Sequence, residues 1–205
     1  MRMDVSKSED VILALRKRLE PVQRADILMN AFEQQFPSAR NASVLIPLFE
    51  QNNETYIAFI RRASSLRSHS GEIAFPGGAM DVGDVSPIVT ALREAQEEIG
   101  LAPSRVEVLG LMPPVFTVVS NFLITPVVAY LPSGPGSLQL QASEVAEIIF
   151  LPLQGLADPN IYHTEEWVRN NESHTVNFYD YGDYRIWGAT GRMFTMLLDL
   201  LRNAY

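Results

Sequence analysis

The chain has 205 residues, of which 47% are hydrophobic and 20% are charged, as is typical of a globular protein with an apolar core. Its net charge of −8 argues against nucleic acid as the main partner, and the absence of cysteine excludes disulfides, thiolate metal ligands and a cysteine nucleophile. No apolar run approaches membrane-spanning length, and residues 1–10 contain no signal-peptide core, so we expect a cytoplasmic protein without a membrane partner.

The first predicted elements are two helices. Residues 8–19 have apolar residues at helical spacing, with Ser8 as the candidate N-terminal cap, and residues 25–36 form the second helix. We assign residues 1–38 to an N-terminal helical extension. Its expected role is scaffold or the contact of a homodimer rather than part of an active site.

A strand hairpin follows the extension. Residues 42–50 and 54–61 are apolar enough to form paired buried strands, and Asn52 and Asn53 suit the turn between them. The next segments are a polar loop at 62–70, an extended piece at 71–75 and a turn at 76–78.

The second half alternates strands with connections. Predicted strands lie at 105–112, 121–131 and 147–150, and Pro126 indicates an edge or a bulge in the second of them. Residues 163–167 are expected to form a surface loop. The remaining elements are a hairpin of 175–179 with 184–187 around Gly182 and a closing amphipathic helix at 188–202. This order favours one domain, residues 39–205, built as an α/β/α sandwich around a mixed sheet.

The central stretch predicts a capped helix over residues 87–99. Ser86 is a suitable N-cap, Pro87 occupies the first helical position and Gly100 stands where a C-terminal cap belongs. Within this helix Glu94 has Glu97 three residues away and Glu98 four residues away, so the three carboxylates share nearly one face.

Clustered carboxylates resist ionising together unless a cation compensates them. Ligands that are only carboxylate oxygens select hard cations, Mg²⁺ or Mn²⁺, and the preceding glycine turn lets the backbone approach a ligand closely. A metal ion can neutralise charge on a pyrophosphate and acidify a water, so the pattern indicates metal-assisted hydrolysis of a phosphoanhydride. The competing interpretation is a solvated acidic face.

Residues 93–101, REAQEEIGL, resemble the second half of the Nudix box, REUxEExGU, with Ala95 at the first aliphatic position. The resemblance implies a Nudix-type fold with Glu94 and Glu98 as the main metal ligands and Glu97 completing the site. It also implies a carbonyl ligand near Gly78 and a catalytic role for Arg93 in orienting the glutamates.

The first half of the box differs from the general pattern. Asp84 follows Gly78 after five residues in place of Glu, and eight residues rather than seven separate Asp84 from Arg93. This register resembles the coenzyme A pyrophosphatase branch of the Nudix hydrolases, with FPGG at 75–78, Asp81 and Asp84 in the loop, and TALREAQEE at 90–98.

That branch carries a second motif upstream, and this chain supplies Arg62, Arg67 and Gly71 in register with it. A guanidinium can hold a phosphate through two parallel hydrogen bonds, so Arg62 and Arg67 are candidate substrate-binding residues, together with the backbone at Gly77. The competing role for the arginines is salt bridges with the acidic loop. His69 is either a phosphate ligand or a surface residue.

The resemblance implies hydrolysis of coenzyme A or its thioesters to 3′,5′-ADP and 4′-phosphopantetheine or its acyl derivative. Two alternatives stay open: another nucleoside diphosphate derivative such as ADP-ribose or a dinucleotide, and a non-catalytic nucleotide sensor. Glu144, before the strand at 147–150, is a further candidate carboxylate, as a base, a ligand or only a cap.

Overall fold

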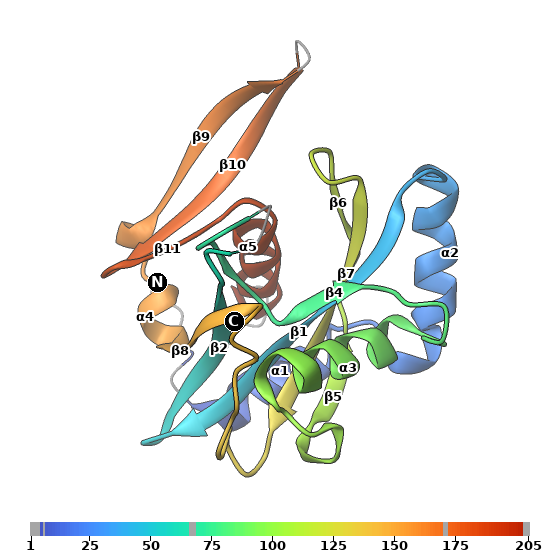
Figure 1. The fold of residues 1–205 in the computed structure, drawn as a ribbon. Helices are drawn as coiled ribbons and strands as arrows, with labels where there is room; N and C mark the ends of the chain where they lie inside the picture. The colour runs from blue at the N-terminus through green and yellow to red at the C-terminus, as the bar shows by residue number, and fades with distance from the viewer. Residues whose placement is uncertain (1–4, 6, 66–68, 170–171, 203–205) are drawn as a thin grey trace.

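A mixed sheet forms the centre of the fold (Figure 1), and the computed structural model describes residues 5, 7–65, 69–169 and 172–202. The strands of this sheet are β1 (Arg40–Gln51), β2 (Glu54–Arg62), β3 (Ile73–Ala74), β4 (Gly77–Ala79), β5 (Glu107–Leu111), β6 (Val115–Thr117), β7 (Phe122–Leu131) and β8 (Val145–Pro152). Their order is β3-β2-β1-β7-β5, with β4 paired to β1, β6 to β7 and β8 to β2.

Strand β1 is central because it pairs with three neighbours, antiparallel with β2 and β4 and parallel with β7. The β1–β2 hairpin has a two-residue turn in which Asn52 and Asn53 have φ angles of 53° and 61°. Asparagine tolerates this left-handed conformation, and such a turn matches the twist of the paired strands. The predicted hairpin is therefore confirmed.

Helices cover both faces of the sheet. The helices are α1 (Ser8–Arg16), α2 (Ala25–Gln35), α3 (Pro87–Ile99), α4 (Leu153–Leu156) and α5 (Gly188–Arg202), with 3₁₀ turns η1 (Val22–Arg24), η2 (Pro103–Arg105) and η3 (Pro159–Ile161). None of the helices in the described ranges is long and apolar enough to cross a membrane.

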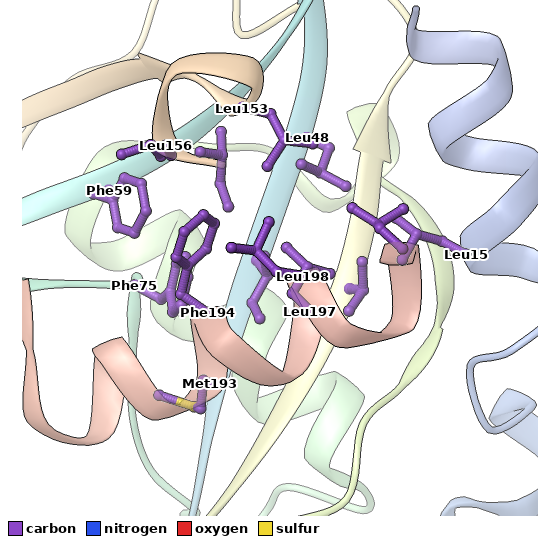
Figure 2. Packing of buried hydrophobic residues seen from close by; sticks show 14 of the residues in the cluster. Leu15, Leu48, Phe59, Phe75, Leu153, Leu156, Met193, Phe194, Leu197 and Leu198 are labelled. Atoms are coloured by element: carbon purple, nitrogen blue, oxygen red, sulfur yellow. The ribbon is translucent and has the colours of Figure 1, made fainter. Parts of the chain in front are cut away.

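Two apolar clusters fill the space between the sheet and its helices. On one face α3 buries Ala91, Ala95 and Ile99 against the central strands. On the other face α1, α4 and α5 share a cluster, and Figure 2 shows Phe59 of β2 and Phe194 of α5 packed together within it. The predicted α/β/α arrangement is confirmed.

The N-terminal helix α1 is part of the core, because Val11 and Leu15 are buried in the cluster that α5 also fills. It ends at Arg16, earlier than expected. Ser8 is not its cap: Lys7 is at the N-cap position without a side-chain hydrogen bond. The Ser8 hydroxyl instead pairs with the Thr55 hydroxyl at 3.1 Å in the interior, where a buried polar group needs a partner.

The expectation that Pro126 marks an edge or a bulge is wrong. Strand β7 has β1 on one side and both β5 and β6 on the other. Pro126 lies between Val127, which pairs with β5, and Ile124, which pairs with β6. Proline has no N–H, and at Pro126 the N–H is missing at the gap between β5 and β6, where no ladder hydrogen bond is needed. The Pro126 carbonyl accepts a hydrogen bond from the Met112 N–H at 3.0 Å.

The glycines expected to turn the chain at 76–78 belong to a strand instead. Gly77 and Gly78 lie in β4, antiparallel to β1, opposite Val44 and Ser43. A side chain at Gly77 would collide with the backbone of β1, at Ser43 and Val44. The glycine is therefore required for close strand approach rather than for a tight turn.

A second sheet projects from the body (Figure 1) and consists, in the described residues, of β9 (Tyr162–Arg169), β10 (Glu172–Tyr181) and β11 (Tyr184–Trp187) in the order β11-β10-β9. The predicted hairpin around Gly182 is confirmed. Strand β9 was expected to be a loop, because its exposed, mostly polar residues lack the apolar alternation that predicts a strand. Tyr179 and Ile186 anchor the sheet in the main core.

Candidate active site

Helix α3 has the boundaries that the sequence predicts. The Ser86 hydroxyl accepts a hydrogen bond from the Val89 N–H at 3.3 Å, Pro87 begins the helix, and Gly100 ends it with a φ of 67°. Since Ala91, Ala95 and Ile99 face the core, the glutamates are carried on the adjoining face, beside β4.

Glu98 is the most buried of the three glutamates, with 2% of the residue exposed. The Gly77 N–H donates to its Oε2 at 2.9 Å, and the guanidinium of Arg62 lies 4.0 Å from its Oε1. Burial raises the pKa of Glu98 to about 7, although the Gly77 hydrogen bond and the Arg62 charge act in the opposite direction. A carboxylate held in this way is ready to exchange a proton or a cation near neutral pH.

Glu94 lies directly against Gly78. A Cβ placed on Gly78 would be 2.5 Å from the Glu94 carboxyl carbon, so only glycine leaves room for this side chain. Burial raises the pKa of Glu94, while a hydrogen bond from Arg93 to its Oε1 at 2.8 Å lowers it in part. The glycine strand and the helix therefore fit together at a carboxylate.

The β1–β4 register decides which glycine carbonyl is available to a ligand. Two backbone hydrogen bonds flank the glycines: Leu45 N–H to the Pro76 carbonyl at 2.8 Å and Met80 N–H to the Asn41 carbonyl at 2.9 Å. Bonded and non-bonded pairs alternate in an antiparallel ladder, so Gly78 is in a bonded position opposite Ser43 and Gly77 is in a non-bonded one. The Gly77 carbonyl therefore points away from β1, on the side where its N–H meets Glu98.

Arg93 connects the acidic loop to the helix. Its Nη2 donates to Asp84 Oδ2 at 2.8 Å and to the Ala79 carbonyl at 3.0 Å, and its Nη1 donates to Glu94 and, at 3.1 Å, to Glu97. The hydrogen bond from Arg93 lowers the pKa of Asp84 to about 2. The expected orienting role of Arg93 thus has a geometric basis, with Asp84 as its main anchor.

Thr90 is a contributor that the sequence did not single out. Its hydroxyl donates to Asp84 Oδ2 at 3.0 Å, and the Asp81 N–H donates to the same oxygen at 3.0 Å. These two donors hold the Asp84 carboxylate toward Arg93. The signal was available in the sequence, because Thr90 lies one helical turn before Glu94.

Glu97 points toward Arg93 and is 59% exposed, in contrast to Glu94 and Glu98. Within the described residues no three Asp, Glu or His side chains are gathered as a ready metal site. Glu94 and Glu98 are therefore the inner carboxylates of the site, and Glu97 lies at its exposed edge.

Arg62 approaches this site from β2. Its Nη1 faces Glu98, and its Nε is buried with no hydrogen-bond acceptor in the part of the chain that the structure describes. Arg67 lies outside the described residues. His69 has a φ of 56° and its Nδ1 lies 3.0 Å from Glu72 Oε2, so the structure places the imidazole against Glu72.

Glu144 is close enough that its charge raises the pKa of both Glu94 and Glu98. Its backbone carbonyl accepts from the Ala63 N–H at 2.8 Å, next to Arg62. The structure thus brings a carboxylate from the loop before β8 toward the α3 glutamates.

The side chains at the site are of a kind that suits a divalent cation, although those described are not gathered into a ready metal site. Glu94, Glu98 and Glu144 repel one another, and the outward Gly77 carbonyl adds a neutral oxygen on the Glu98 side. Arg93 is already bonded to Asp84, which leaves the excess negative charge only partly balanced. Oxygen ligands of this kind are those that Mg²⁺ and Mn²⁺ prefer.

Comparisons with known proteins point to one family. Residues 39–170 match the NUDIX domain family. NudL of Photorhabdus laumondii, described as an uncharacterized Nudix hydrolase, is 38% identical over 177 residues, which cover 82% of this chain and 93% of that protein. NudL of Citrobacter koseri is 41% identical over 153 residues, covering 74% and 77% respectively.

Among solved structures, the Nudix hydrolase RenU of M. smegmatis is similar with a TM-score of 0.49 and 22% identity, covering 58% of this chain and 74% of that one.

Proposed function

The chain belongs to the Nudix hydrolase family, whose members hydrolyse the pyrophosphate bond of nucleoside diphosphate derivatives, and from this premise we propose that its substrate is coenzyme A or a coenzyme A thioester. The products would be 3′,5′-ADP and 4′-phosphopantetheine or its acyl derivative. The proposal is supported by the spacing of Arg62, Gly71 and the FPGG segment, and by the Asp81–Asp84 loop that is closed by a hydrogen bond at 3.0 Å.

The observation that carries the proposal is the Arg62 guanidinium, which is partly exposed, lies 4.0 Å from Glu98 Oε1 and has no acceptor for its Nε among the described residues. A buried donor without an acceptor is costly, so such a group in a native protein calls for an explanation. A phosphate beside Glu98 would give the exposed part of this guanidinium an acceptor, and the guanidinium shape suits phosphate. We propose the same role for Arg67, which the motif places five residues later.

We propose Glu94, Glu98 and the Gly77 carbonyl as ligands of Mg²⁺ or Mn²⁺, in preference to the Gly78 carbonyl, with Glu97 completing the set. When bound, the ion would neutralise charge on the diphosphate and acidify a water. Arg93 keeps the Glu94 carboxylate in place, and Arg62 orients the phosphate. Glu98 or Glu144 accepts the proton that the attacking water loses, since both carboxylates lie at the site.

A substrate panel tests this function. The purified protein is incubated with Mg²⁺ and coenzyme A, acetyl-coenzyme A, ADP-ribose or a dinucleoside polyphosphate, and the products are separated. We expect 3′,5′-ADP to be released from the coenzyme A compounds and no release in the presence of EDTA. A preference for ADP-ribose would reject the substrate, and binding without product from any compound would favour the nucleotide sensor.

We also propose that residues 1–38 are an extension of a Nudix domain that spans 39–205. The family match begins at residue 39, whereas α1 is built into the core through Leu15. Deleting residues 1–38 should therefore lower stability. A shift from dimer to monomer in sedimentation would identify the extension as the contact of a homodimer.

A further inference from the structure

Three side chains from three strands meet at the junction of the two sheets. Arg61 Nε of β2 donates to Glu147 Oε2 of β8 at 2.9 Å, and the Tyr184 hydroxyl of β11 donates to Glu147 Oε1 at 3.1 Å. The Arg61 guanidinium lies 5.5 Å from the centre of the Tyr184 ring. The hydrogen bond from Tyr184 therefore joins the second sheet to β8, and the cation–π contact joins it to β2.

Arg61 and Arg62 are consecutive in β2, so their side chains point to opposite faces of the sheet. Phe59 packs on the α5 side and Ile60 on the α3 side, which assigns Arg61 to the former and Arg62 to the latter. Whatever fixes the backbone at Arg61 also fixes the direction of Arg62 toward Glu98.

A β-bulge occurs at this point. Arg61 pairs with Glu147 but Arg62 pairs with Val145, so Ala146 has no partner. The extra residue reverses the alternation of β8: Ile149 packs on the α5 side, whereas Val145 packs on the α3 side. The bulge thus brings the chain just before Val145, which includes Glu144, to the face that carries the α3 glutamates.

We propose that Glu147 and Tyr184 are positioning residues: by holding Arg61 beside the bulge, they set the directions in which Arg62 and Glu144 reach the active site. This inference rests on the proposed function of Arg62 as a phosphate ligand. It gives the second sheet a role in the reaction, because Tyr184 is the side chain that connects β11 to Glu147.

The contacts among Arg61, Glu147 and Tyr184 are better suited to orienting a side chain than to stabilising the fold. The Arg61 and Glu147 side chains are 31% and 41% exposed, and ion pairs with this exposure contribute little to stability. Loss of Glu147 should therefore change ligand binding more than thermal stability.

The affinity for ADP, measured by NMR titration with Mg²⁺ present, tests the inference without relying on turnover. Glu147→Ala should weaken ADP binding about threefold to tenfold. Tyr184→Phe should weaken it less, and Glu147→Gln, which keeps an acceptor for Arg61, should restore most of the affinity. Asp180→Ala is the matched control, since it removes the ion pair with Arg185 at 2.7 Å in the second sheet at a similar exposure of 37%.

A double-mutant cycle decides between positioning and a general structural effect. If Glu147 acts through Arg62, Glu147→Ala should have no further effect on ADP affinity in an Arg62→Ala background. Equal losses in both backgrounds would overturn the inference, as would a full loss in the Asp180→Ala control. If Glu147→Ala does not fold, Tyr184→Phe is used in the same cycle. Failure of the substrate panel in the wild-type protein would refute the proposed function alone, because the cycle measures binding.

Discussion

The backbone N–H of Gly77 donates a hydrogen bond to the carboxylate of Glu98 at 2.9 Å, although 21 residues separate them in the chain. The contact joins the glycine strand β4 to the last turn of α3 and holds an acidic side chain in the interior. Burial opposes the ionised form of Glu98, and its pKa of about 7 reflects this opposition. The burial of the Glu98 carboxylate should therefore lower the stability of the folded protein when no cation is bound.

Replacing Glu98 with glutamine should abolish turnover and stabilise the metal-free protein. Glutamine keeps an acceptor for the Gly77 N–H but carries no charge to desolvate. At pH 8 in EDTA we expect the free energy of unfolding to rise by about 2 kcal/mol. Urea denaturation measures the change, and the coenzyme A assay measures the loss of activity.

Glu97→Gln is the control for that experiment, because Glu97 is on the same helix but is largely exposed. It should leave the free energy of unfolding nearly unchanged in EDTA. A Glu98→Gln variant that is less stable than the wild type at pH 8 would contradict the account of buried charge.

The metal-free protein should lose stability as the pH rises from about 4.5 to about 7. The folded state raises the pKa of Glu98 from 4.5 to about 7, so the folded protein binds the proton more tightly than the unfolded chain. The stabilisation is fully present below pH 4.5 and is lost as the pH rises through 7. Thermal unfolding in EDTA across this range measures the slope.

Addition of Mg²⁺ at pH 8 should recover stability if Glu98 is a ligand, since an ion that binds only the folded state stabilises it by mass action. An unchanged Tm at millimolar Mg²⁺ would argue against the metal site. The Glu98→Gln variant should show a smaller recovery in the same titration.

Local signals in the sequence were sufficient for α3 and for the α/β/α layers. As expected, Ser86 is the N-cap of the helix, Pro87 is its first residue and Gly100 is its C-cap. The bulge at Ala146 could not be predicted, because it depends on the pairing of β8 with β2, a strand far away in the sequence. Strand β9 pairs with the next strand, β10, but its exposed and mostly polar residues carry no strand pattern. A register shift between two strands cannot be predicted from the local sequence of either strand.

For the candidate site, the sequence indicates residues but not their geometry. The spacing on α3 is compatible with three inward glutamates, but Arg93 draws Glu97 toward the surface. The sequence also cannot distinguish the carbonyl of Gly77 from that of Gly78, because the choice depends on the ladder with β1. Both differences arise from tertiary contacts rather than from helix periodicity.

Asp84→Ala should destabilise the protein by about 2 kcal/mol, because it leaves Arg93 without its main partner in a partly buried position. The freed guanidinium should bind Glu94 and Glu97 more tightly, so Mg²⁺ affinity should fall as well. Urea denaturation and Mg²⁺ titration measure the two effects. Asp81→Ala is the matched control, since Asp81 is 73% exposed and 3.7 Å from Arg93, and an equally large loss there would contradict the prediction.

Gly78→Ala and Gly83→Ala form a pair that tests the contact between β4 and α3. The added Cβ at Gly78 would lie 2.5 Å from the Glu94 carboxyl carbon, whereas no neighbouring atom of the described residues lies within 4 Å of a Cβ at Gly83. Neither glycine has a φ in the left-handed region, so alanine is compatible with the backbone at both positions. We therefore expect Gly78→Ala to move Glu94, to weaken Mg²⁺ binding and to reduce kcat about tenfold or more.

Gly83→Ala should keep wild-type activity and should be slightly more stable, by about 0.5 kcal/mol, because alanine restricts the unfolded chain. Steady-state kinetics, Mg²⁺ titration and thermal unfolding on both variants separate the two effects. Full activity and unchanged Mg²⁺ affinity in Gly78→Ala would show that the position of Glu94 does not matter for turnover. The assignment of Glu94 as a metal ligand would then have to be abandoned.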